Sequence, residues 1–117
     1  MLLVVLISLG EGSLHSSDIE QIVNAHPVVL FSKSYCPYCK KAKGVFDSIG
    51  VPYYALELDQ LPNGPEYQNL LLEMTGQRTV PSVWIHGKHI GGSDKVVSLH
   101  AEGLLKDLVH QTKEAEL

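Results

Sequence analysis

The sequence predicts an α/β fold in which a four-stranded mixed sheet is flanked by helices. Short apolar, β-favouring runs alternate with longer segments whose apolar residues recur at helical spacing, in the order α-β-α-β-α-β-β-α. The early β-α-β unit requires a crossover helix between parallel strands, whereas the last two strands are close enough to form an antiparallel hairpin. With 117 residues and 44% hydrophobic content, the chain suffices for one domain with one core.

The first half of the domain begins with a helix that polar residues and a proline delimit. Ser17 and Glu20 have the spacing of a capping box, and Pro27 ends this segment. The run that follows is apolar enough to be a central strand, and Gly50 stops the next helix. In chain order, we expect a strand at 28–33, a helix at 37–49 and a strand at 53–58.

The second half continues with a helix and a hairpin. A turn-rich loop at 60–65 precedes the helix, and Gly76 caps its end. Two short strands, 80–86 and 89–90, should form a hairpin around Gly87-Lys88. The helical spacing is carried by Tyr67, Leu70, Leu71 and Met74.

The chain is predicted to close with a further helical region. Ser93 and Asp94 can cap its start, and Gly103 can split it. The polar tail 111–117 should be frayed. The residues that we expect to face inward from this region are Val97, Ala101, Leu104, Leu105 and Leu108.

Cys36 and Cys39 are the only two cysteines of the chain and are separated by two residues. Next to a strand and then a helix, this spacing predicts a thioredoxin-like redox motif that closes to a disulfide and reopens. The first turn of a helix has unpaired N–H groups and a partial positive charge, which favour a thiolate over a thiol. Pro37 fits the first helical position, because its missing N–H costs nothing there.

The two thiols are predicted to differ in exposure. Cys39 shares an apolar helix face with Ala42, Phe46 and Ile49, and this face should pack on the sheet. Cys36 should instead be presented at the tip of the helix. We therefore assign Cys36 as the attacking nucleophile and Cys39 as the resolving thiol.

The sequence around the cysteines is basic, although the whole chain has a net charge of −4. No Asp or Glu occurs between Gln21 and Phe46. Because the chain is mildly acidic and its lysines lack a stripe of stacking aromatics, we expect no nucleic acid partner. The lysines of this window are Lys33, Lys40, Lys41 and Lys43.

Two other interpretations of the cysteine pair stay open. A zinc site needs about four ligands, and only His86 and His89 lie close together among the histidines, so we expect no metal. A structural disulfide is possible, but closing so short a loop removes little entropy from the unfolded chain. Both arguments favour redox chemistry.

The N-terminal segment 1–13 is apolar and is predicted to precede the domain, which spans 14–117. It is too short to span a bilayer. It could be the core of a secretory signal, but no Lys or Arg precedes it and no Ala-x-Ala site follows. It could equally be the remnant of a longer anchor, or a segment packed on the domain. Localisation is therefore either cytoplasmic or in the secretory pathway.

Four features resemble the glutaredoxins of the thioredoxin superfamily, and the resemblance runs from about residue 17 to 109. Cys36-Pro37-Tyr38-Cys39 is identical to the active-site tetrapeptide of the dithiol class. Thr79-Val80-Pro81 matches the cis-proline motif of the family, and Gly91-Gly92-Ser93-Asp94 matches its glycine-rich glutathione site. Lys33 matches the basic residue three positions before the first cysteine.

The resemblance implies a thioredoxin-like fold and a glutathione-dependent oxidoreductase that reduces protein–glutathione mixed disulfides and protein disulfides. Glutathione is implied as the co-substrate, with Val80 pairing its backbone and Asp94 accepting from its γ-glutamyl ammonium group. Lys33, with Gln77 or Arg78, would meet the glycyl carboxylate. The residues implied to contact glutathione are Lys33, Tyr38, Gln77, Arg78, Thr79, Val80, Pro81, Gly92, Ser93 and Asp94.

The partners implied are glutathione and glutathionylated or disulfide-containing proteins, and we expect a monomer without metal. One alternative is an iron–sulfur carrier, in which a cluster bridges two chains through Cys36 and bound glutathione. Pro37 argues against it, because resembling proteins that hold clusters usually have a small residue there. The other alternative is a redox-dependent binding module without turnover.

Overall fold

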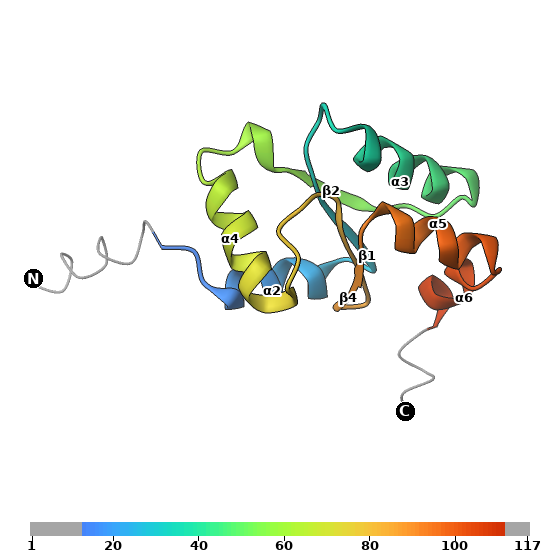
Figure 1. Ribbon diagram of the computed structural model, residues 1–117. Coiled ribbons are helices and arrows are strands. Elements are labelled where there is room, and N and C mark those ends of the chain that lie inside the picture. The colour runs from blue at the N-terminus through green and yellow to red at the C-terminus, as the bar shows by residue number, and fades with distance from the viewer. Residues whose placement is uncertain (1–12, 112–117) are drawn as a thin grey trace, which may run out of the picture.

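The computed structural model describes residues 13–111, in which a central sheet lies between two groups of helices (Figure 1). The order of elements confirms the predicted alternation, with the last helical region divided in two. The strands are β1 (Val28–Ser32), β2 (Tyr54–Glu57), β3 (Ser82–Ile85) and β4 (Lys88–Gly91). The helices are α2 (Ser16–Ala25), α3 (Pro37–Ser48), η1 (Leu58–Gln60), α4 (Gly64–Thr75), α5 (Ser93–Ala101) and α6 (Leu105–His110).

The sheet has the strand order β2-β1-β3-β4. Strand β1 pairs with β2 in parallel, with Ser32 opposite Glu57. It pairs with β3 in the antiparallel sense, and β3 pairs with β4 in the same sense. The four-stranded mixed sheet and the central position of β1 are therefore confirmed.

Strand β1 serves both hydrophobic cores, because all five of its residues are buried and alternate residues point to opposite faces. Helices α3, α5 and α6 cover one face of the sheet, and α2 and α4 cover the other (Figure 1). The first core includes Val28, Leu30, Phe46, Val96 and Leu105. The second core includes Ile19, Val23, Val29, Phe31 and Leu71.

Helix α3 starts at the point predicted for it, shortly after the end of β1. Cys36 is its N-cap and Pro37 occupies the first helical turn. Its buried residues are Cys39, Ala42 and Phe46, which confirms the predicted apolar face. The sheet therefore fixes this face, and the face in turn fixes which cysteine is covered.

The predicted cap of the first helix is wrong. Helix α2 begins at Ser16 with His15 as its N-cap, so Ser17 and Glu20 both lie inside the helix. The backbone N–H of His15 donates to the Asp18 carboxylate at 2.9 Å. Asp18 thus fills the third helical position, which a capping box assigns to an acceptor side chain.

The predicted hairpin turn is wrong by one residue. The turn consists of His86 and Gly87, whose φ angles are 49° and 78°. Two successive residues with positive φ make the tight turn that matches the twist of a hairpin, and β4 therefore begins at Lys88.

The inward face of the last helical region also differs from the prediction. Val96 is fully buried, whereas Ala101 is exposed and Leu104 is 47% exposed. Gly103, with φ 76°, ends the first helix, and α6 starts anew with Leu105 buried. The break explains the exposure of Leu104, which lies between the two helices. Ala101 lies within α5, where five positions after Val96 the helical period turns it away from the buried face.

The predicted N-terminal segment 1–13, apart from Ser13, and most of the predicted tail lie outside the described residues. Within residues 13–111, no helix combines the length and apolar character that crossing a membrane requires.

Candidate active site

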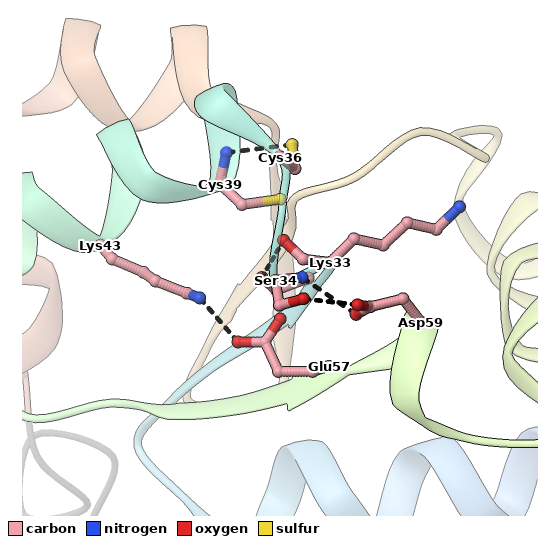
Figure 2. Close-up of polar contacts among 8 residues, drawn as sticks. Lys33, Ser34, Cys36, Cys39, Lys43, Glu57 and Asp59 are labelled. Carbon is pink, nitrogen blue, oxygen red and sulfur yellow. Dashed lines mark hydrogen bonds and ion pairs between the residues drawn. The ribbon is translucent and has the colours of Figure 1, made fainter.

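The Cys36 thiol lies at the N-terminus of α3, where it is partly exposed. Its sulfur accepts a hydrogen bond from the backbone N–H of Cys39 at 3.2 Å (Figure 2). On the other side, Cys36 Sγ lies 3.9 Å from the Val80 carbonyl oxygen. Because an N–H donor at a helix start favours a negative acceptor, this position suits a nucleophilic thiolate.

The Cys39 thiol has a contrasting environment, because its side chain is fully buried on the inner face of α3. Burial, together with the hydrogen bond to Cys36, raises the pKa of Cys39 to about 11, although contacts with Lys33 and Ser32 oppose this shift. Cys39 therefore stays protonated at neutral pH. The structure thus places the two thiols in the unequal surroundings that the sequence predicted.

A carboxylate holds the loop that leads to Cys36. Asp59, in η1, accepts hydrogen bonds from both the backbone N–H of Ser34, at 2.9 Å, and the Ser34 hydroxyl (Figure 2). The side-chain and backbone hydrogen bonds from Ser34 lower the pKa of Asp59. The sequence analysis missed this contact. Its only signal was that parallel strands β1 and β2 end at the same edge of the sheet, which brings the residues after each strand together.

A second carboxylate forms an ion pair with one of the lysines near the cysteines and so offsets its positive charge. Lys43 Nζ lies 2.6 Å from Glu57 Oε2, and both side chains are mostly covered (Figure 2). Lys33 extends away from the two sulfur atoms in the same view. The charge of the lysine cluster is therefore not all directed at the thiols.

The segment that faces Cys36 contains the predicted proline motif, and the Val80–Pro81 peptide bond is cis. Gln77 supports it by donating from Nε2 to the carbonyl oxygens of Thr79 and Pro81, each at 2.9 Å. Gln68, largely buried on α4, donates to the Arg78 carbonyl at 3.1 Å. Side chains thus fix the backbone that lies opposite the nucleophile.

A cavity of about 800 Å³ opens beside this segment. Every residue that the sequence implied as a glutathione contact lines it, except Lys33 and Arg78. Arg78 is exposed, and its Nε donates to Asn69 Oδ1 at 3.1 Å. The lining residues are Tyr38, Gln77, Thr79, Val80, Pro81, Gly92, Ser93, Asp94, Lys95 and Ser98.

The far wall of the cavity is the start of α5. Ser93 is only 5% exposed, and its Oγ is buried without a hydrogen-bond partner in the described part of the chain. The first N–H groups of a helix are also free to bind an acceptor. This wall therefore offers several hydrogen-bond donors to an anionic group. Lys95 and Ser98, which the sequence analysis did not single out, extend it along α5.

Among residues 13–111, no three His, Cys, Asp or Glu side chains lie together in a cluster that could hold a metal ion. Trp84, on the opposite face of the sheet, is a core residue whose Nε1 donates to Ser82 Oγ at 3.1 Å.

Known proteins are similar to this chain in sequence and in architecture. The chain matches the family model described as Glutaredoxin over residues 28–90. Glutaredoxin-C8 of Oryza sativa subsp. japonica is 50% identical over 97 residues, which cover 81% of this chain and 71% of that protein. Glutaredoxin-C4 of Arabidopsis thaliana is 45% identical over 114 residues, which cover 96% and 84%. The crystal structure of a buckwheat glutaredoxin–glutathione complex is 48% identical with a TM-score of 0.78, and the match covers 80% of this chain and 84% of that one.

Proposed function

The chain belongs to the glutaredoxin family, and from this premise we propose that it is a glutathione-dependent thiol–disulfide oxidoreductase that acts through Cys36 and Cys39. The observation that carries this conclusion is the position of the Cys36 sulfur. It lies at the start of α3, facing Val80, one of the residues that line the cavity. A sulfur atom of a bound mixed disulfide can reach it there.

With a glutathionylated protein, the Cys36 thiolate attacks the glutathione sulfur. The new bond joins Cys36 to glutathione, and the protein thiolate leaves and takes up a proton. A second glutathione thiolate then attacks this mixed disulfide, which releases Cys36 and oxidised glutathione. The N–H of Cys39, 3.2 Å from the Cys36 sulfur, stabilises Cys36 as attacking and as leaving thiolate.

With a protein disulfide, Cys36 forms the mixed disulfide with the substrate and Cys39 resolves it. Cys39 loses its proton and attacks Cys36 Sγ, and the bond between Cys36 and the substrate sulfur breaks. The substrate thiolate leaves and takes up a proton, and a Cys36–Cys39 disulfide remains. The high pKa of Cys39 in the reduced chain leaves Cys36 as the thiol that attacks first. The unequal burial of the two thiols thus separates the two kinds of reaction.

Glutathione fits the cavity as an extended peptide. The backbone of Val80 supplies one N–H and one C=O for a strand-like pairing. The start of α5, with Ser93 and Asp94, receives the γ-glutamyl end. At the glycyl end, both N–H groups of the Gln77 side chain are already bound to carbonyl oxygens, so Lys33 and Arg78 are the cations available to its carboxylate.

Glutathionylated and disulfide-containing proteins are the proposed protein partners, and the chain is proposed to act as a monomer. Tyr35 and Tyr38, which are 65% and 62% exposed, flank Cys36 and support contact with a substrate protein. No specific observation favours the iron–sulfur carrier or the binding module.

The test is turnover of a glutathionylated protein by the reduced chain, measured as release of the protein thiol in the presence of glutathione. Repeated turnover is expected, with oxidised glutathione as a product. Glutathione binding without turnover would indicate the binding module. A brown colour after anaerobic purification would indicate the iron–sulfur carrier.

A further inference from the structure

The start of α5 places a carboxylate and an ammonium group next to each other in the wall of the cavity. Asp94 and Lys95 are consecutive in sequence, and both line the cavity. Ser98 lies one helical turn further and lines it too. Among the lining residues, which all belong to the described part of the chain, Lys95 is the only cation.

The charge of Lys95 is available to a ligand. Among the described residues, the only ion pair is that between Lys43 and Glu57, so the Lys95 ammonium group is not neutralised by a neighbour. The stem of Lys95 lies close over Gly91, because a Cβ at Gly91 would come within 3.2 Å of the Lys95 Cβ. The first carbons of the Lys95 side chain thus lie against the backbone just before Gly92, which lines the cavity.

The ligand end that is proposed for this wall carries two opposite charges. The γ-glutamyl end of glutathione has an ammonium group and a carboxylate on one carbon atom. Asp94 complements only the ammonium group. The Ser93 hydroxyl and the first N–H groups of α5 can donate to the carboxylate, but none of them is charged. A cation beside them completes the match.

Resting on the proposed function, we propose that Lys95 is a specificity-determining residue whose ammonium group pairs with the α-carboxylate of the γ-glutamyl end, while Asp94 pairs with its ammonium group. The cavity then selects ligands that carry both charges on this carbon. Because the site is partly exposed, we expect each charge pair to change the Michaelis constant about threefold to tenfold and to weaken with added salt.

The experiment uses three substrates, each a mixed disulfide between the same peptide and a different thiol. The thiols are glutathione, glutaryl-Cys-Gly, which lacks the ammonium group, and 4-aminobutyryl-Cys-Gly, which lacks the α-carboxylate. Lys95→Gln should raise the Michaelis constant about threefold to tenfold for the two substrates that retain the carboxylate, with little change in kcat. The same substitution should leave the Michaelis constant for the aminobutyryl substrate unchanged. Asp94→Asn should show the mirror pattern, since it affects the two substrates that retain the ammonium group.

Lys88→Gln is the matched control, because it removes the same charge from β4 outside the cavity lining and should leave all three constants unchanged. If Lys95→Gln raises all three constants alike, or none of them, the pairing is wrong while the proposed function stands. If the unsubstituted chain turns over none of the three substrates, the proposed function fails, and the pairing fails with it.

Discussion

The two ends of the Cys36–Cys39 motif lie in different environments, although the same side chain occupies both. At Cys36, a thiol caps a helix, meets a backbone N–H and lies beside a cavity. At Cys39, a thiol points into the core and is fully buried. Position in the fold, rather than residue type, therefore sets the reactivity of each thiol. The first environment suits exchange with substrate, and the second suits a delayed intramolecular step.

The largest expected effect comes from removing either thiol. Cys36→Ser should lower the rate with every disulfide substrate by roughly a hundredfold or more, since the other cysteine, Cys39, is fully buried. Cys39→Ser should keep most of the activity with glutathionylated proteins and lose most reduction of protein disulfides. Rates with one glutathionylated protein and one disulfide protein would measure this split. Equal losses in both variants with the glutathionylated protein would contradict the assignment.

The burial of Cys39 should also appear as a pH dependence of stability. An exposed thiol in the unfolded chain releases its proton near its ordinary pKa of 9.0, whereas folded Cys39 keeps its proton to about pH 11. Between these values the folded state binds more protons, so its stability should fall as pH rises, by about 2–3 kcal/mol in total. Below pH 9 this contribution is fully present.

Denaturant unfolding would measure this effect in the Cys36→Ser background, which cannot close the disulfide. Cys36→Ser/Cys39→Ala is the matched control. The difference in unfolding free energy between the two variants should shrink as the pH rises above about 9, because burial, the largest cause of the raised Cys39 pKa, is kept in this background. Parallel curves would show that the folded environment does not hold the proton on Cys39.

A smaller effect is expected from loosening the loop before Cys36. Asp59→Ala removes the acceptor for both hydrogen bonds from Ser34, whereas Ser34→Ala removes only the one from its hydroxyl. Both hydrogen bonds end on an exposed carboxylate, so solvent weakens each of them. We expect kcat with a glutathionylated protein to fall about twofold to tenfold in Asp59→Ala and less in Ser34→Ala.

Asp59→Asn serves as the control, since its amide oxygen can still accept a hydrogen bond from Ser34. If Asp59→Ala lowers thermal stability but leaves kcat unchanged, Asp59 stabilises the fold without positioning the nucleophile.

Local patterns in the sequence predicted the features that depend on neighbouring residues. The burial of Cys39 follows from the periodicity of α3, and the complete burial of β1 follows from its apolar content. These predictions succeeded because one segment contains the whole signal. The predicted face of the last helices failed at Leu104 because Gly103 divides the signal between two helices, and it failed at Ala101 because α5 is buried on the face of Val96.

Contacts between distant segments could not be predicted in this way. Ser34 and Asp59 are 25 positions apart, and only the parallel pairing of β1 with β2 brings them together. The sequence implied Gln77 as a ligand contact. It gave no sign that the side-chain amide of Gln77 donates its hydrogen bonds to neighbouring backbone carbonyl oxygens. Lys95 likewise became notable only when the cavity placed it beside Asp94.

Site-resolved alkylation of the reduced chain tests the inequality of the two thiols most directly. The chain would be treated at neutral pH with a small alkylating reagent below one equivalent, and the label at each cysteine would be followed in time by peptide mass mapping. Modification of Cys36 should be at least about tenfold faster than that of Cys39, because thiolate character and exposure both favour it. Equal rates, or faster modification of Cys39, would contradict the account.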